Sequence, residues 1–381
     1  MCAEHEVCLP GDALPEAPPV LSRRNVMRYG LGAGLGLLLA GCGVNPGLPA
    51  PGDAPANTLE TLAAFPAVVG CAAWSARAPT EAVTLLGRRP TMVIVHHTAT
   101  PNTSDLSRAQ AYNLARSIQQ WHLAQGWIDS GQQFTISRGG TILEGRHRSL
   151  EAVRGGRQHV RGAQCEGFND ISIGIENEGT YAYSTPPTAL YSQLVRLCAY
   201  ICGQYGIPST SIYGHRDFVD TSCPGDALYG LLPGLRRDVA ARLGEAAQPW
   251  PTVRSGNRAE VAWTVQLLLR ARGQNVTADG SFGPATQAAV QAFQSSVGIA
   301  SDGVVGPQTW ERLVVTLRAG ARGDAVRALQ RQLAEAGQNL GVDGSFGPGT
   351  EAALRRFQAA RGVTVDGFAG PATWSALLKT S

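Results

Sequence analysis

The second half of the sequence contains an internal repeat. The motif DGSFGP begins at Asp279 and again at Asp343, 64 residues later, and the same offset relates two downstream GPxTW motifs. Each copy also contains three stretches of apolar residues at helical spacing. Gly supplies the permissive dihedral angles of such turns, and Pro is tolerated at a helix start. We therefore predict two three-helix units, over residues 254–315 and 316–381.

Four aromatic residues recur at helical spacing in these units: Phe293, Trp310, Phe357 and Trp374. Burial statistics favour a role in the core, with contact to a ligand as the alternative. The FGPxT and GPxTW turns are similar to those of the common bacterial peptidoglycan-binding module, over about residues 254–378. This resemblance implies that the units bind the cell wall, where two weak sites would reinforce each other through effective concentration.

Residues 68–243 mix strand patterns with helix patterns. MVIVHHT, QQFTISRGGTILEG and ISIGIENEG resemble strands, whereas residues 106–125 and 190–204 have helical periodicity. The predicted class is α/β: a mixed central β-sheet flanked by helices, followed by the two small three-helix all-α modules. The proline-containing stretch 244–253 is a predicted linker.

The first 42 residues have the pattern of an export signal. Arg23 and Arg24 precede an apolar run that is too short to span a bilayer, and the run ends in LAGC at Cys42. The pattern resembles a Tat signal with a lipobox, which implies a lipid anchor on Cys42 and an extracytoplasmic location facing the wall. An ordinary secretory signal is the alternative. Residues 43–67, rich in Pro and Gly, are a predicted flexible linker.

The charge balance limits the kinds of partner. The formal net charge is only +3 and 16% of the residues are charged, with no basic run, so nucleic-acid binding is not expected. We expect a monomer whose contact with a membrane is limited to the lipid anchor.

Two distant motifs supply candidate zinc ligands. HHTAT begins at His96, and GHRDFVDTSCPGD contains His215 and Cys223. Imidazole and thiolate are preferred zinc ligands, and a catalytic site uses three protein ligands. Each residue alone has a simpler explanation, because a His at a strand end is more often a hydrogen-bonded polar group.

Together these motifs resemble those of the zinc-dependent N-acetylmuramoyl-L-alanine amidases, a family that includes phage lysozyme-amidases and animal peptidoglycan recognition proteins. The resemblance covers about residues 71–235 and implies that His96, His215 and Cys223 bind zinc. It also implies hydrolysis of the amide bond between muramic acid and L-alanine in peptidoglycan. His97 should face the other side of the strand, because side chains alternate.

The general base departs from the pattern common in the family. A Tyr usual there corresponds to Gln132, and a neutral amide cannot act as a base. The strand ISIGIENEG is similar to the segment of cytoplasmic anhydro-muropeptide amidases in which the first Glu is the base, which implies this role for Glu176. Spacing alone does not separate Glu176 from Glu178, since both would share a strand face.

The remaining site residues follow from the same resemblance. Thr221 corresponds to a Lys or Thr that stabilises the oxyanion in relatives, and a Thr hydroxyl can donate one hydrogen bond there. His159, Asn169 and Gln132 correspond to positions at the substrate groove. Hydrogen bonding within loops is the alternative for His159 and Asn169.

Four cysteines remain after the export signal, Cys42 and Cys223 are set aside: Cys71, Cys165, Cys198 and Cys202. An even number in an exported protein predicts two disulfides of unassigned pairing, with a second zinc site as the alternative.

Two other functions stay open for the whole chain. A receptor without activity would use the same groove, and another zinc hydrolase of the wall is possible, although HExxH is absent.

Overall fold

The computed structural model describes residues 65–257 and 260–379. The predicted export signal, Cys42 and most of the first linker lie outside these residues. The first unit contains a six-stranded sheet in the order β1-β5-β4-β7-β3-β8 and a separate pair, β2-β6. The strands are β1 (Val68–Val69), β2 (Leu85–Leu86), β3 (Met92–His97), β4 (Phe134–Ile136), β5 (Ile142–Glu144), β6 (His159–Val160), β7 (Ser172–Asn177) and β8 (Ile212–Gly214).

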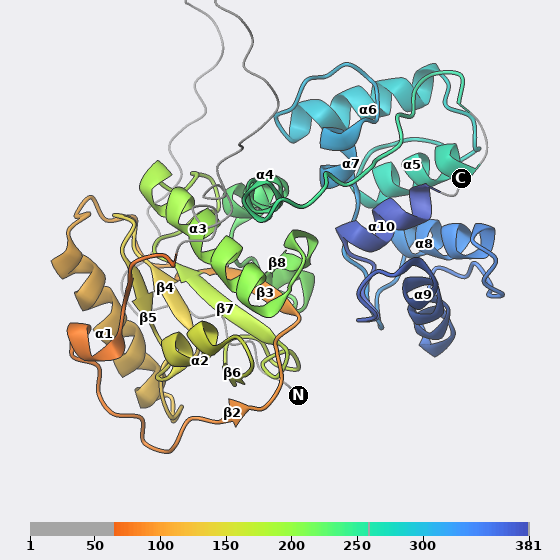
Figure 1. The fold of residues 1–381 in the computed structure, drawn as a ribbon. Helices are drawn as coiled ribbons and strands as arrows, with labels where there is room; N and C mark the ends of the chain where they lie inside the picture. Colours follow the sequence, from red (N-terminus) through yellow and green to blue (C-terminus); the bar gives the residue numbers. More distant parts are fainter. Residues whose placement is uncertain (1–64, 258–259, 380–381) are drawn as a thin grey trace, which may run out of the picture.

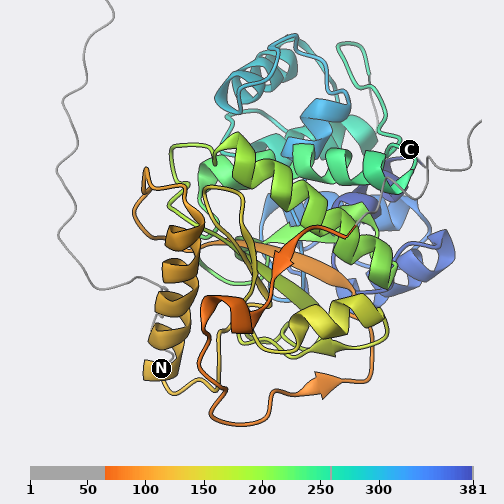
Figure 2. The same ribbon diagram turned by 60° about the vertical axis from the view of Figure 1, so that its left-hand side comes forward.

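Helices flank this sheet, and further helices form the C-terminal units (Figures 1 and 2). The first unit contains α1 (Arg108–Ala124), α2 (Ser149–Gly155), α3 (Thr188–Tyr205), α4 (Asp226–Leu243) and the short 3-10 helices η1 (Cys71–Trp74), η2 (Ser209–Ser211) and η3 (His215–Asp217). The C-terminal helices are α5 (Glu260–Ala271), α6 (Pro284–Ser296), α7 (Pro307–Leu313), α8 (Asp324–Glu335), α9 (Pro348–Arg361) and α10 (Pro371–Leu378). The predicted fold class is confirmed.

Local sequence signals account for several of these helices. The Oγ of Ser107 accepts the N–H of Gln110 at 3.1 Å and so caps the start of α1. As the GP turns predict, α6, α7, α9 and α10 each begin at a Pro that follows a Gly. The pattern did not single out α4, which contains Pro233 within the helix.

Strand β3 determines which residues reach each face of the sheet. It lies between β7 and β8 and is parallel to both. Val93 packs in the large core that α3 and α4 share with the sheet, whereas Met92 packs in a smaller cluster on the opposite face. Because side chains alternate along a strand, His96 belongs to the second face and His97 to the first.

Each C-terminal unit contains two turns of the same construction. In every case the Nε2 of a buried glutamine donates hydrogen bonds to the aspartate that begins the turn and to a threonine hydroxyl near the start of the next helix. The four sets are Gln266–Asp279–Thr286, Gln294–Asp302–Thr309, Gln330–Asp343–Thr350 and Gln358–Asp366–Thr373. We call these turns 1 to 4, at residues 279–284, 302–307, 343–348 and 366–371. The sequence pattern predicted only the longer repeat of 64 residues.

The repeated aromatic residues form the core of the C-terminal units. Phe293, Trp310, Phe357 and Trp374 are each at most 3% exposed, as predicted. The indole N–H of Trp310 donates to the carbonyl of Pro251, and that of Trp374 donates to the carbonyl of Val315, both at 2.8 Å. Equivalent residues therefore make equivalent bonds in the two units.

The prediction of two disulfides is wrong for this structure, in which Cys71, Cys165, Cys198 and Cys202 are buried free thiols. Cys198 and Cys202 lie on α3 and face the large core, while Cys71 and Cys165 belong to two other clusters. The thiols are thus distributed among three separate packing regions. They also form no metal-binding group within the described part of the chain. No helix in that part is long and apolar enough to cross a membrane.

Candidate metal centre

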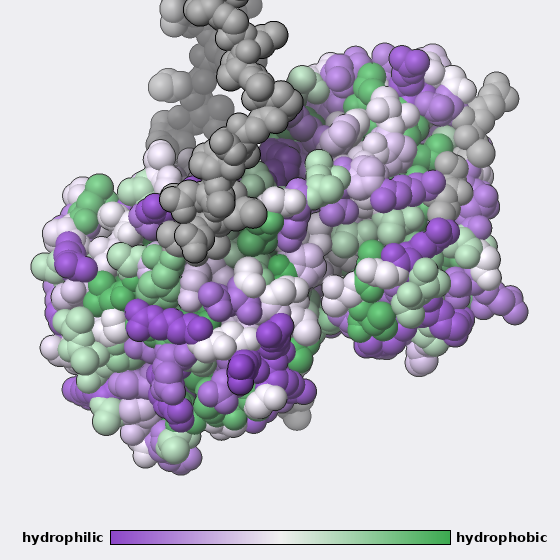
Figure 3. Space-filling model, viewed as in Figure 1, coloured by the Kyte–Doolittle hydropathy of each residue, from purple (hydrophilic) through white to green (hydrophobic). Residues whose placement is uncertain are grey.

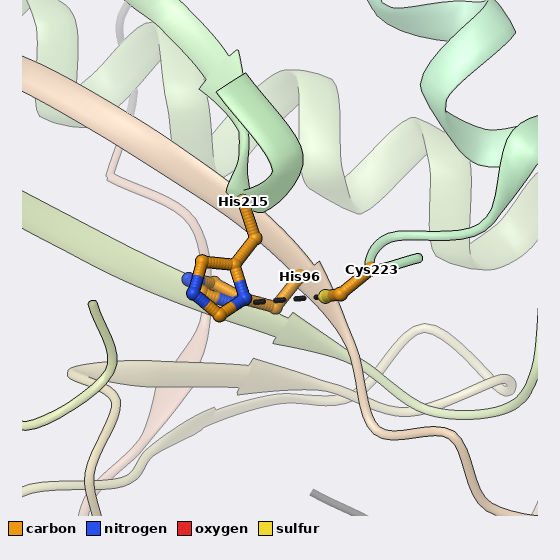
Figure 4. Close-up of side chains that lie close together, drawn as sticks. All are labelled: His96, His215 and Cys223. Carbon is orange, nitrogen blue, oxygen red and sulfur yellow. Dashed lines mark hydrogen bonds between the residues drawn. The ribbon is translucent and has the colours of Figure 1, made fainter. Parts of the chain in front are cut away.

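Three side chains from distant parts of the sequence converge at one end of the sheet (Figure 4). One ligand atom from each of His96, His215 and Cys223 lies within 4.8 Å of the others, the one such group found among the described residues. The Sγ of Cys223 lies 3.7 Å from Nδ1 of His96. The imidazole rings of His96 and His215 have centroids 4.4 Å apart.

The parallel sheet brings the two histidines together. His96 lies at the end of β3, and His215 directly follows its parallel neighbour β8. Carboxyl ends of parallel strands meet at one edge of a sheet, where ligands commonly bind. Two strand ends thus place two of the three candidate ligands side by side.

The other residues of the HRD motif hold the loop that carries Cys223. Asp217 accepts the N–H of Gly214 at 2.9 Å and the hydroxyl of Tyr229 at 2.7 Å. Arg216 pairs with Asp226 at 2.5 Å, and its backbone N–H donates to the carbonyl of Cys223 at 3.1 Å. The motif therefore fixes the Cys loop against the end of β8.

The protonation chemistry of the three residues fits zinc. Burial lowers the pKa of His96 well below its usual value and lowers that of His215 to about 4, so both rings are neutral and have a lone pair to donate. Burial raises the pKa of the Cys223 thiol, whereas the N–H of His97 donates to its Sγ at 3.4 Å. A buried thiolate needs a compensating cation, and two imidazoles with one thiolate are a preferred zinc donor set.

Gln164 contacts the other nitrogen of His96, a relationship that the sequence did not predict. Its Oε1 lies 2.5 Å from Nε2 of His96, and its Nε2 donates to the hydroxyl of Ser172 at 2.8 Å. Gly174 makes room for this side chain, because a Cβ there would lie 2.5 Å from Cγ of Gln164. Gln164 is 68 residues from His96, so no local pattern connects them.

Glu176 lies beside the three candidate ligands. It is the register partner of His96 across β7 and β3. Its Oε2 is buried and has no hydrogen-bond partner among the described residues, and burial raises the pKa of the carboxyl group to about 8. Glu178, in contrast, lies beyond β7 and accepts hydrogen bonds from Nε2 of Gln110 at 3.0 Å and from the N–H of Arg138 at 2.7 Å. Only the first of the two carboxylates has an unengaged oxygen at the site.

Thr221 and Gln132 lie in the surroundings of the centre. The Oγ1 of Thr221 accepts the N–H of Cys223 at 3.2 Å, which leaves the hydroxyl hydrogen available to another acceptor. Gln132 is buried and donates to Oγ1 of Thr135 at 2.9 Å, while Thr135 is the register partner of Glu176 on β4. Gln132 is thus bonded to the residue that lies beside the base candidate in the neighbouring strand.

The other two candidate substrate residues are bonded to the backbone. His159 is fully buried, and its Nδ1 donates to the carbonyl of Arg88 at 2.9 Å. The Oδ1 of Asn169 accepts the N–H groups of Gln164 and Cys165 at 2.8 and 3.0 Å. Asn169 therefore shapes the loop from which Gln164 reaches His96.

Comparison with known proteins gives the family to which this chain is similar. Residues 86–226 match the family model described as N-acetylmuramoyl-L-alanine amidase, and residues 258–313 and 322–377 match that of a peptidoglycan binding domain. Peptidoglycan recognition protein 1 of Bos indicus is 33% identical over 146 residues, which are 37% of this chain and 69% of that protein.

Two further relatives are matched over smaller shares of their length. Peptidoglycan-recognition protein LB of Drosophila melanogaster is 32% identical over 41% of this chain, and N-acetylmuramoyl-L-alanine amidase of Homo sapiens is 35% identical over 36% of it. The chain spans 63% of the length of the first and 23% of the second. The solved structure of wild-type Drosophila PGRP-LB has a TM-score of 0.38 at 29% identity and covers 42% of this chain and 89% of its own. The chain belongs to the family of N-acetylmuramoyl-L-alanine amidases and peptidoglycan recognition proteins.

Proposed function

We propose that this protein is a zinc-dependent N-acetylmuramoyl-L-alanine amidase that cuts the amide bond between muramic acid and L-alanine in peptidoglycan. One observation carries the proposal: the complete His96, His215 and Cys223 set lies beside a buried carboxylate oxygen of Glu176 that has no hydrogen-bond partner in the described part of the chain. A set of three protein ligands leaves a coordination position free for catalysis.

The surroundings of the residues support the roles that we assign to them. When bound, zinc would polarise the scissile carbonyl and lower the pKa of water to about 7. Glu176 would take a proton from the attacking water and deliver it to the departing amine of L-alanine, because its raised pKa of about 8 suits proton transfer near neutrality. Thr221 would donate its free hydroxyl hydrogen to the developing oxyanion. Gln132, His159 and Asn169 would shape the groove.

We further propose a division of labour along the chain. Residues 68–243 would be the catalytic domain, and the modules at 254–315 and 316–381 would hold the enzyme on the wall. The two matches to the peptidoglycan binding domain support this wall attachment. Export by a Tat-like signal in residues 1–42 and a lipid on Cys42 would place a monomeric enzyme outside the cytoplasm, joined to its membrane by the linker at 43–67.

A receptor without activity is the second candidate, because some relatives are peptidoglycan recognition proteins. The intact thiolate position argues against it, since a receptor needs no Cys223 with a buried Glu176 nearby. The receptor predicts wall binding without the release of any new amine.

Purified peptidoglycan gives a direct test. The zinc-loaded protein should generate new L-alanine N-termini as muramic lactyl groups are freed, and a chelator should abolish this release until zinc is restored. Glu176→Gln and Cys223→Ser should lose about 100-fold or more of the rate, as is typical when acid–base or metal groups are removed. Glu166→Gln, which changes an exposed Glu in the Gln164 loop, is the matched control and should keep its activity. Full activity in Glu176→Gln would exclude the proposed base.

A further inference from the structure

Turn 4 differs from its three sister turns in what lies against it. A Cβ on Gly283, Gly306 or Gly347 would meet no atom of the described residues within 4 Å, whereas a Cβ on the equivalent Gly370 would lie 2.6 Å from the hydroxyl oxygen of Tyr213. Gly306 and Gly370 have nearly the same backbone angles and both precede a helix. The close approach therefore comes from the amidase sheet and not from the turn itself.

The aspartates of turns 2 and 4 also differ, in their exposure and in the direction of their pKa shifts. Asp302 in turn 2 is exposed, and hydrogen bonds from Val304 and Gln294 lower the pKa of its carboxyl group. Asp366 in turn 4 makes the equivalent bonds, yet burial raises its pKa. Turn 4 is therefore covered by other parts of the protein, whereas the aspartate of turn 2 is exposed to solvent.

An aromatic cluster joins turn 4 to the sheet unit. The ring centroid of Phe368 lies 5.7 Å from that of Phe168 and 5.5 Å from that of Phe218. Phe368 belongs to the cluster that packs under Met92 on the second face of the sheet. The equivalent residue of turn 2 is Val304, so this position has an aromatic ring in turn 4, which contacts the sheet unit, and an aliphatic side chain in turn 2.

A basic residue reinforces this contact. The guanidinium of Arg318 donates a hydrogen bond to the carbonyl of Phe218, and its carbon lies 6.0 Å from the ring centre of Phe168. Figure 1 shows the C-terminal helices beside the β8 edge of the sheet. In Figure 3 the sheet unit and the C-terminal units meet along this side. The second module thus completes a hydrophobic cluster of the sheet unit.

The segments under turn 4 are those that hold the metal centre. Tyr213 and Phe218 flank His215 within the same short stretch of chain, and Phe168 lies in the loop that carries Gln164. Gln164 in turn contacts Nε2 of His96 at 2.5 Å. Both loops therefore have candidate zinc-centre residues on one side and the second module on the other.

We propose that turn 4 of the second module is a positioning element of the metal centre, which fixes the loops of His215 and Gln164 through Phe368 and Gly370. The module is then a structural part of the amidase as well as a unit that binds the wall. Groups that orient metal ligands commonly change metal affinity by about 10- to 100-fold when they are altered. The proposal rests on the zinc site of the proposed function.

A matched pair of substitutions in the full chain tests it. Gly370→Ala introduces a methyl group against buried Tyr213, whereas Gly306→Ala introduces the same group at the same turn position in open space. We expect the zinc dissociation constant, measured by chelator competition, to rise about 10-fold in Gly370→Ala and to stay within about 2-fold in Gly306→Ala. Amide hydrogen exchange at residues 164–171 and 215–219 should accelerate only in Gly370→Ala.

Phe368→Val, which installs the residue of turn 2, provides a second variant should Gly370→Ala fail to fold, and it should shift both readouts in the same direction. Equal zinc affinity and equal exchange in Gly370→Ala, Phe368→Val and the wild type would overturn the proposal. A wild-type protein that binds no zinc would contradict the proposed function instead, and hydrogen exchange alone would then decide whether turn 4 fixes the loops.

Discussion

The Oε1 of Gln164 lies 2.5 Å from Nε2 of His96, on the side of the ring opposite the nitrogen that faces Cys223. Oε1 can only accept a hydrogen bond, so Nε2 of His96 carries the proton and Nδ1 keeps its lone pair. The glutamine therefore selects the tautomer that can bind a metal together with Cys223.

Replacement of Gln164 should weaken zinc binding. Gln164→Leu removes the acceptor, and the zinc dissociation constant should rise about 10- to 100-fold. Gln164→Glu keeps an acceptor at the same reach and should stay much closer to the wild type. Chelator competition on the purified proteins measures both values. Leu and Glu variants with equal affinity would mean that the hydrogen bond does not orient the ring.

Much of this site could be predicted from the sequence because its residues lie in short motifs at strand ends. His96 follows a clear strand pattern, and His215 and Cys223 lie eight residues apart. Gln164 could not be found this way, since its contact with His96 depends on loop geometry across 68 residues and on the space left by Gly174.

The disulfide prediction was wrong for a related reason. An even number of cysteines says nothing about which thiols meet, and packing distributes these four among three clusters. The contact between turn 4 and the sheet unit could not be predicted from the repeated motif either. Turns 2 and 4 share one motif, and the difference lies in what the rest of the chain brings against them.

Glu176 and Glu178, the two carboxylates of the ISIGIENEG motif, should have different roles: Glu176 in catalysis and Glu178 in stability. Glu178→Ala leaves the amide of Gln110 and the N–H of Arg138 without their acceptor, so stability should fall by about 1–3 kcal/mol while the rate per folded molecule is largely kept. Glu176→Gln removes no observed hydrogen bond and should keep its stability but lose activity. Urea unfolding and the L-alanine release assay measure the two effects. Loss of activity in folded Glu178→Ala would reverse the assignment.

Acid should destabilise the protein through His122. This side chain is 4% exposed, its Nδ1 accepts the N–H of Gly131 at 3.2 Å, and its ring stacks on Trp127 with centroids 4.4 Å apart. Burial, with a smaller contribution from Arg146 and against the opposing effect of Asp129, lowers its pKa from 6.5 to about 4. The neutral ring is thus part of the folded core.

The direction of the pH effect follows from this lowered pKa. Between pH 6.5 and 4 the unfolded chain binds a proton at His122 that the folded protein does not, so stability is complete above pH 6.5 and falls as the pH decreases towards 4. By pH 5, the protonation of His122 in the unfolded chain lowers the free energy of unfolding by about 2 kcal/mol. His122→Gln should therefore lose about 2 kcal/mol less than the wild type between pH 7.5 and pH 5 in urea unfolding. An unchanged pH dependence would show that His122 is not the titrating group.

The buried glutamines should be the residues on which each repeated turn depends. Nε2 of Gln294 bonds Asp302 at 2.8 Å and Thr309 at 3.0 Å, and its Oε1 accepts the N–H of Gly303 at 2.9 Å. Gln294→Leu would leave these groups unpaired, and local stability should fall by about 2–3 kcal/mol, which corresponds to a roughly 30- to 150-fold loss of amide protection in α6 and α7. Exposed Gln308 in the same unit is the control, and Gln308→Ala should leave protection unchanged. The sheet unit should keep its protection in both variants, since the bonds that are lost join α6, turn 2 and α7 within the first C-terminal unit. Equal protection in Gln294→Leu and the wild type would mean that the glutamine fills space without holding the turn.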